Sequence, residues 1–192
     1  MKKLLITGFD AFGGEQINPS WEAVKLLPDQ IREYELCKLQ LPTVYEKAAV
    51  ILLEKAAKIL PDVIISVGQA GGREAVTPER IAVNIRAARI ADNAGVLLDG
   101  DRISPDGPAA YFSTLPVEAM RDAIRSANLP SAVSNSAGTF VCNDVMYSAL
   151  HRYQGTGVRC GFIHVPYLPE QGSPSLPLEQ TVQALTAAIQ AL

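Results

Sequence analysis

The chain has 192 residues, of which 48% are apolar and 19% charged, so it is long enough to bury a core and lacks the composition of a disordered protein. Its net charge of −3 is spread along the chain without a basic stripe, so we expect no nucleic-acid partner. No apolar stretch approaches the ~20 residues that a membrane helix requires, so we expect no membrane contact.

Strands and helices alternate in the first part of the chain. Residues 4–7 predict a short strand, and the polar loop 18–20 opens a helix in which Trp21, Val24 and Leu27 follow helical spacing. Residues 35–41 alternate as a strand, and 43–60 carry helix formers up to a proline. The continuous β-branched run within 62–68 is typical of a parallel strand that is buried on both faces.

The second part of the chain continues this alternation around one irregular segment. We expect strands at 81–85, 132–134 and 158–165 and helices at 116–128, from Cys142 onward, and at 178–192. Residues 91–107 are rich in Asp, Gly and Pro and predict an irregular excursion or a small hairpin, while 169–177 predict a loop. The predicted fold is an α/β protein, a three-layer α/β/α sandwich with a mostly parallel twisted central sheet.

The cysteines and histidines are few enough to be compared pair by pair. Cys142 and His151 lie nine residues apart on one predicted helix, and Cys160 and His164 lie four apart on one predicted strand. Each spacing corresponds to about 13 Å, which excludes a hydrogen bond within either pair. Cys37 lies inside a predicted strand, where a cysteine more often packs in the core than takes part in catalysis. Cys142 with His164 therefore remains the best pair for nucleophilic catalysis.

The number and spacing of the cysteines also indicate whether the protein binds a metal and in which redox environment it works. Three cysteines are an odd count, and none forms a Cys-x-x-Cys pair. This argues against a disulfide framework and against a closed zinc site. We expect no metal and a reducing, cytoplasmic environment.

Cys142 follows a loop of small residues and begins a predicted helix. Backbone N–H groups and the helix dipole at that position are expected to lower the pKa of the thiol and to hold an oxyanion, although an inner cysteine on a helix is most often part of the core. His164 ends its strand at the edge where parallel sheets build their sites. By residue type alone, the carboxylates that qualify to orient the imidazole are Glu79, Asp92, Asp99, Asp101, Asp106 and Asp144.

Two glycine-rich segments, 8–14 and 68–72, follow predicted strands. Neither has the spacing of a dinucleotide-binding loop or a P-loop, so we expect no nucleotide cofactor. The first segment holds Phe9 and Phe12, which either form the wall of an apolar pocket or anchor their own loop.

Four motifs, in order, make the chain resemble pyroglutamyl peptidase type I, a family of cysteine peptidases. They are TGFDAFGG with NPS at 7–20, TPERIAVN at 77–84, SAGTFVCN at 136–143 and GFIHVPY at 161–167. One departure is Ala11, which stands where the family usually has proline. It removes no chemical group.

The resemblance implies a role for each residue that matches these motifs. Cys142 would be the nucleophile, His164 the general base and acid, and Glu79 the group that orients His164. The remaining site residues that the resemblance implies are Phe9, Phe12, Phe140 and Val141 as pocket lining, the Gln69 backbone as a lactam contact, and Arg89 near the oxyanion.

The resemblance also implies an activity and an assembly. The activity would be removal of an N-terminal pyroglutamyl residue from peptides through a thioester, by one peptidase domain over 1–192 that needs no cofactor and forms a homotetramer. Two alternatives remain: a related hydrolase or acyl transferase that accepts another acyl group, and a binding module that has lost activity.

Overall fold

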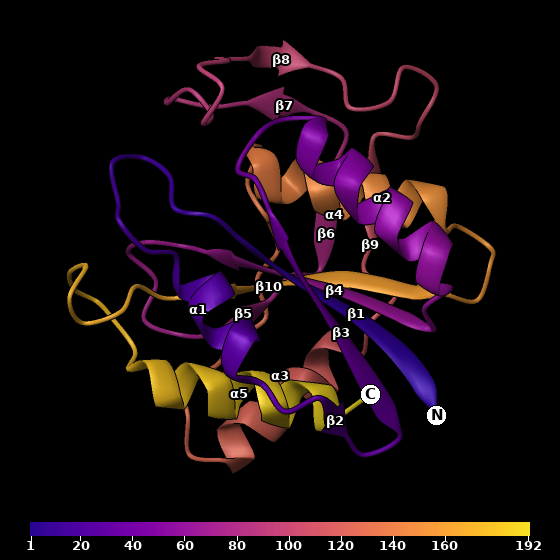
Figure 1. Ribbon diagram of the computed structural model, residues 1–192. Coiled ribbons are helices and arrows are strands. Elements are labelled where there is room, and N and C mark those ends of the chain that lie inside the picture. Colours follow the sequence, from indigo (N-terminus) through magenta and orange to yellow (C-terminus); the bar gives the residue numbers. More distant parts are fainter.

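The computed structural model describes all 192 residues, and a six-stranded sheet forms its centre (Figure 1). The strand order is β2-β3-β1-β4-β10-β5, in which β3, β1, β4 and β10 are parallel and the short edge strands β2 and β5 are antiparallel to their neighbours. The mostly parallel sheet is therefore confirmed. The strands are β1 (Lys2–Phe9), β2 (Gln30–Ile31), β3 (Tyr34–Leu41), β4 (Val63–Gln69), β5 (Thr77–Pro78) and β10 (Arg159–Val165).

Five helices cover the two faces of the sheet, as the three-layer prediction requires. The helices α1 (Pro19–Leu26), α3 (Val117–Ser126) and α5 (Leu178–Gln190) pack on one face, and α2 (Lys47–Ile59) and α4 (Val141–Arg152) pack on the other (Figure 1). Every residue of β4 is buried, because each of its faces contributes to a separate apolar cluster. None of the helices combines the length and the apolar character needed to span a bilayer.

The start of α1 shows how a short polar sequence sets a helix boundary. The side chain of Asn18 accepts hydrogen bonds from the Ser20 backbone N–H at 3.1 Å and from the Ser20 hydroxyl at 2.7 Å. Pro19 takes the first helical position, where its missing N–H leaves no bond unmade. The Asn18 amide also donates to the Asp10 carbonyl at 2.8 Å, so the cap holds the loop that follows β1.

Two of the predicted elements need correction. The strand expected at 132–134 is absent, and only isolated bridges of Ser131 with Val76 and of Ser134 with Glu79 occur there. The Ser134 backbone still bonds to Pro78 and Arg80, but its hydroxyl exchanges hydrogen bonds with the backbone of Ser136, and this local turn keeps the bridge from growing into a ladder. The helix expected from residue 43 begins at Lys47, because Glu46 has a φ of 60° and cannot continue a right-handed helix.

The segment between β5 and α3 forms two small antiparallel ladders. One pairs β6 (Ile81–Val83) with β9 (Ala110–Phe112), and the other pairs β7 (Arg86–Ala87) with β8 (Asp99–Asp101). The predicted strand at 81–85 is thus present but shorter, and the predicted excursion contains β8. In Figure 1, β7 and β8 lie beyond α2 and α4, outside the three layers.

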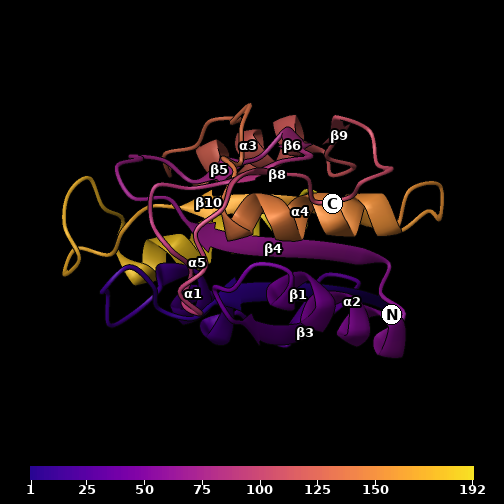
Figure 2. The same cartoon turned by 90° about the horizontal axis from the view of Figure 1, so that it is seen from above.

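The carboxyl ends of the parallel strands share one edge of the sheet. β3 and β4 lie on opposite sides of β1 in the sheet, so the strand order reverses at β1. The loops that leave β1 and β4 therefore run in different directions at this edge. Figures 1 and 2 both show the loops after β1 and after β10 at this same end of the sheet. A crevice where the strand order reverses is the usual place for a site in such sheets.

Candidate active site

Cys142 is the second residue of α4, which confirms its predicted place in the first turn of a helix. The preceding residue outside the helix, Phe140, has an extended backbone and gives no side-chain cap. Gly138 has a φ of 77°, a conformation that suits glycine and turns the chain into the helix. The first backbone N–H groups of a helix have no partner within it, so these donors lie next to the thiol.

His164 and Cys142 approach the same face of the sheet. His164 lies on β10 directly opposite Gly68 of β4. A β-carbon on Gly68 would stand 2.8 Å from the Cys142 sulfur and 2.7 Å from the Phe162 ring, and that ring packs on the His164 imidazole at a centroid distance of 4.7 Å. Because side chains alternate along a strand, Phe162 and His164 share one face, and the sulfur lies beside it.

Glu79 supplies the carboxylate that contacts the imidazole. Its side chain is fully buried, and its Oε1 lies 2.7 Å from Nδ1 of His164. An ionised carboxylate only accepts, so Nδ1 carries the proton and Nε2 is left to accept one. The other carboxylates left open by the sequence are engaged elsewhere or exposed: Asp92, Asp144, Asp99, Asp101 and Asp106.

The protonation states of the three groups follow from their burial and their charges. Burial, followed by the charge of Glu79, raises the pKa of the Cys142 thiol to about 12. Burial also lowers the pKa of His164, although the hydrogen bond to Glu79 opposes the shift. Burial would raise the pKa of Glu79, but the hydrogen bond and charge of His164, the Ser134 side chain and the charge of Arg73 outweigh it and hold that pKa low.

At neutral pH the group is therefore a neutral thiol, a neutral imidazole and a carboxylate. The expectation that the helix start lowers the pKa of the Cys142 thiol is wrong, because burial dominates. A thiol in this state needs a base within the same step to become nucleophilic.

Aromatic rings form one wall beside the thiol. Phe12 and Phe140 are both half-buried, with ring centroids 5.8 Å apart, and the Tyr45 ring meets Phe140 edge-on at 5.4 Å. The two other predicted lining residues lie deeper: Phe9 is 1% exposed and Val141 is fully buried in the core. Tyr45 was missed, because nothing in its sequence context separates it from the helix that follows.

Gln69 ends β4 and lies opposite Val165, at the edge that carries the loops. Its side-chain oxygen accepts a hydrogen bond from Gln171 Nε2 at 3.0 Å, and the same nitrogen lies 3.2 Å from Glu15 Oε2. Gln171 thus joins the loops after β1, β4 and β10. Sequence reasoning missed it, because its loop has no periodic pattern.

Arg89 is exposed and follows β7, and its side chain makes no hydrogen bond or ion pair with the rest of the chain. The structure does not bring it to the thiol through any such contact. Its contribution to the oxyanion stays a prediction.

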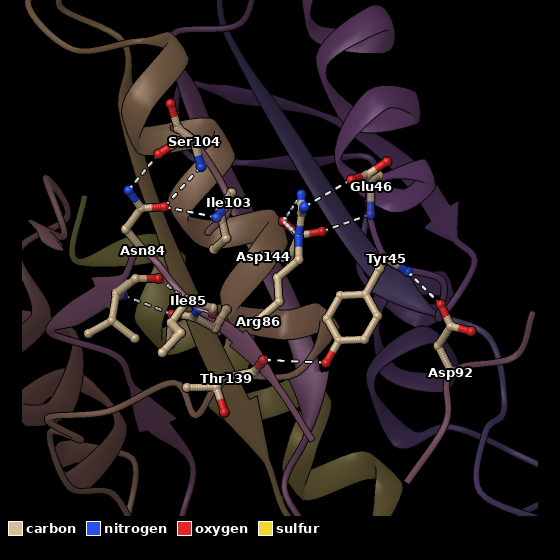
Figure 3. A network of polar contacts seen from close by, with 12 residues as sticks. Tyr45, Glu46, Asn84, Ile85, Arg86, Asp92, Ile103, Ser104, Thr139 and Asp144 are labelled. Carbon is tan, nitrogen blue, oxygen red and sulfur yellow. Dashed lines mark hydrogen bonds and ion pairs between the residues drawn. The ribbon is translucent and has the colours of Figure 1, made fainter. Parts of the chain in front are cut away.

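A polar network centred on the buried pair Arg86 and Asp144 supports the start of α4 (Figure 3). Arg86 donates from Nε and Nη2 to Asp144 Oδ1 at 3.0 and 2.9 Å, and from Nη1 to Glu46 Oε1 at 2.9 Å. The other oxygen of Asp144 accepts from the Glu46 backbone N–H at 2.8 Å. Asn143, next to the thiol, bonds to both backbone groups of Val83. These contacts fix the first turn of α4 to α2 and to β6.

Metal-binding side chains do not cluster in this protein. No group of three or more His, Cys, Asp or Glu side chains is arranged to hold a metal ion.

Comparison with known proteins gives one consistent result. The family model for pyroglutamyl peptidase matches residues 2–192. A pyrrolidone-carboxylate peptidase from Levilactobacillus brevis is 52% identical, with 99% of this chain and 97% of that protein covered. The crystal structure of pyroglutamyl peptidase I from Bacillus amyloliquefaciens superposes with a TM-score of 0.95 at 46% identity and covers 100% of this chain and 96% of that one. Pyrrolidone carboxyl peptidase from Thermococcus litoralis has a TM-score of 0.95 at 38% identity, with 100% and 93% covered.

Proposed function

The chain belongs to the pyroglutamyl peptidase family, and we propose that Cys142, His164 and Glu79 are the residues with which it hydrolyses the bond after an N-terminal pyroglutamyl residue. The observation that carries this assignment is the 2.7 Å contact between Glu79 and His164, on the sheet face where the Cys142 sulfur lies. The chain is thus an omega-peptidase of the cysteine class.

In the first half of the reaction, His164 Nε2 takes the proton of the Cys142 thiol while the sulfur attacks the pyroglutamyl carbonyl carbon. Because the pKa of that thiol is about 12, this proton transfer accompanies the attack and does not precede it. The new oxyanion accepts hydrogen bonds from backbone N–H groups at the start of α4. The carbon–nitrogen bond then breaks, and the imidazolium gives its proton to the leaving amine.

In the second half, water replaces the amine. His164 accepts a proton from the water, whose oxygen attacks the thioester carbon, and the proton returns to the departing sulfur as pyroglutamate forms. In both halves an imidazolium appears briefly within 2.7 Å of the Glu79 carboxylate. That fixed negative charge stabilises it and keeps the ring in one orientation.

Specificity follows from the chemistry of the lactam. Pyroglutamate has no charged amine, so the apolar wall of Phe12 and Phe140 suits its ring. Gln69 lies at the sheet edge that carries the loops and would bond the lactam amide. A free glutamyl terminus would bring an uncompensated charge against the same rings. This apolar wall therefore favours pyroglutamate, because burying a charge against it costs free energy.

A substrate panel on wild type and Cys142→Ala tests the proposal. We expect cleavage of a pyroglutamyl fluorogenic amide, little cleavage of the prolyl and glutamyl amides, and no cleavage by folded Cys142→Ala. Cys37→Ser and Cys160→Ala, in which the cysteines are partly and fully buried, are the matched controls and retain activity.

Other outcomes identify the alternatives. Preference for another acyl group would indicate a related hydrolase or acyl transferase, and binding without turnover would indicate a binding module. Activity lost in EDTA and restored by zinc would contradict a thiol mechanism.

We also propose that residues 1–192 act as one peptidase domain, in a homotetramer and in the cytoplasm. Three unpaired cysteines support a reducing compartment. Large apolar side chains on the surface support a covered interface, among them Leu60 at 77% and Phe112 at 69% exposure. Light scattering during size-exclusion chromatography measures the assembly, and a monomer at micromolar concentration would contradict the tetramer.

A further inference from the structure

Arg73 lies in the loop between β4 and β5 and contacts Glu79 of the proposed triad. Its Nη1 lies 2.6 Å from Glu79 Oε1 and 2.6 Å from the Thr77 hydroxyl, and its Nη2 donates to the Ser136 carbonyl at 3.2 Å. The Arg73 side chain is 31% exposed, whereas that of Glu79 is fully buried. The guanidinium thus joins a catalytic carboxylate to the loop that leads into Cys142.

The two oxygens of Glu79 have unequal environments. Oε1 receives both the His164 ring and the Arg73 guanidinium. Oε2 is buried and has no hydrogen-bond partner. His164 and Arg73 make the two short hydrogen bonds to this carboxylate, and the Ser134 side chain also lies close enough to lower its pKa. Without Arg73, only one of the two short hydrogen bonds would remain.

We propose that Arg73 is a positioning residue for the triad: it fixes the Glu79 carboxylate against His164 and ties to it the loop that carries Cys142. The inference rests on the proposed function. A planar guanidinium suits this task because its two terminal nitrogens reach two segments at once, which a lysine amine does not.

The charge of Arg73 adds a second, measurable consequence. The titratable or charged groups that face His164 are Glu79 after β5, Cys142 at the start of α4 and Arg73 after β4, while Gly68 and Phe162 carry no charge. Beside the larger effects of burial and Glu79, the positive charge of Arg73 lowers the pKa of His164. Without it, the imidazole would hold its proton to higher pH.

Two substitutions separate the charge from the geometry. For Arg73→Gln we expect kcat to fall roughly tenfold or more with little change in KM. We also expect the acid limb of the kcat/KM profile to move to higher pH, because the charge that lowers the pKa of His164 is gone. Arg73→Lys keeps the positive charge but loses the two terminal nitrogens that bond to two segments. Its acid limb should therefore stay at the wild-type pH, while kcat should still fall.

Arg80→Gln is the matched control. The Arg80 side chain binds the same loop through Asn135 at 2.9 Å and pairs with Glu118 at 2.7 Å, but its guanidinium makes no hydrogen bond or ion pair with the neighbouring Glu79 carboxylate. We expect this variant to keep the wild-type kcat and pH profile.

The decisive readouts are pyroglutamyl amide kinetics across pH and the melting temperature. The proposal is overturned if folded Arg73→Gln keeps the wild-type kcat or the wild-type acid limb. It is also overturned if Arg80→Gln loses as much kcat as Arg73→Gln does. Should Arg73→Gln not fold, wild-type kcat in Arg73→Lys overturns it. Failure of the proposed function has a different signature, namely turnover by Cys142→Ala.

Discussion

The backbone of Gly68 and the sulfur of Cys142 are packed so closely that a single added methyl group would come within 2.8 Å of the sulfur. The same methyl group would meet the Phe162 ring at 2.7 Å, on the strand that carries His164. Glycine at this position is thus what allows the thiol to lie over the sheet.

Gly68→Ala is expected to displace the thiol and to lower kcat/KM on the order of 100-fold, since a shift of about 1 Å in a reacting group has effects of this size. The overpacking should also destabilise the fold by about 1–3 kcal/mol. Enzyme kinetics and urea unfolding measure the two effects.

A double-mutant cycle gives the control. In the Cys142→Ala background the sulfur is gone, so the stability cost of Gly68→Ala should shrink. An equal cost in both backgrounds would mean that the methyl group does not press on the sulfur.

Glu79→Gln should leave the fold intact and lower kcat by roughly 10²–10⁴-fold, because a neutral amide cannot stabilise the imidazolium that forms on His164. KM should change little, since Glu79 is fully buried behind the imidazole. Kinetics together with a melting curve measure both. Near-normal kcat in the folded variant would remove Glu79 from the triad.

Phe12→Ala should reduce kcat/KM for pyroglutamyl amides by roughly ten- to two-hundredfold, through the loss of about 1–3 kcal/mol of pocket contact. Alkylation of Cys142 by iodoacetamide should keep its rate, because it needs no alignment of a lactam. Unchanged kcat/KM with a lower melting temperature would mean that Phe12 only anchors its loop.

Phe9→Ala is the contrasting variant. Phe9 is 1% exposed and packs on Phe162, so its truncation should cost about 3–5 kcal/mol of stability. We expect a large fall in melting temperature. A kinetic defect without that fall would instead place Phe9 in the pocket wall.

As the pH increases, kcat/KM should reach half of its plateau below pH 6.5, the ordinary pKa of histidine. Burial lowers the pKa of His164, and only the neutral ring accepts a proton. The alkaline side should not follow formation of free thiolate, since burial raises the pKa of Cys142 to about 12. A kcat/KM that climbs steadily from pH 7 to pH 9 would show that a preformed thiolate is the nucleophile.

Stability has a matching pH dependence. Below pH 6.5 the unfolded chain protonates His164 while the folded protein keeps it neutral, so the free energy of unfolding falls as the pH drops through this range. The low pKa of Glu79 acts in the same direction below 4.5. Urea unfolding at several pH values checks this, with His164→Gln as a variant whose slope should be flatter.

The regular elements could be predicted because each had its own local signal. The β-branched run of β4 and the helix opened by the polar loop 18–20 both appear where the sequence places them. The strands β2 and β5, of two residues each, were missed because no period exists over so few positions. Their pairing depends on neighbours that are distant in the sequence.

The site could be predicted only in part. Spacing excluded two cysteine–histidine pairs, and α4 and β10 contain those pairs as expected. The spacing did not distinguish Glu79 from the other carboxylates, which only the family resemblance did. Arg73, Arg86 and Gln171 had no signal at all, because their partners are brought near by loops and not by a repeat.

The start of α2 is completed by side chains from other segments. The Tyr45 backbone N–H donates to Asp92 at 2.9 Å, and the Glu46 N–H donates to Asp144 at 2.8 Å, in the first turn of the helix that holds Cys142. These two amide hydrogens exchange with solvent only when α2 and its partners separate. The exchange rate of the Glu46 amide therefore reports, from outside the reacting groups, on how often α4 separates from α2, while that of Tyr45 reports on the contact of α2 with the segment that holds Asp92.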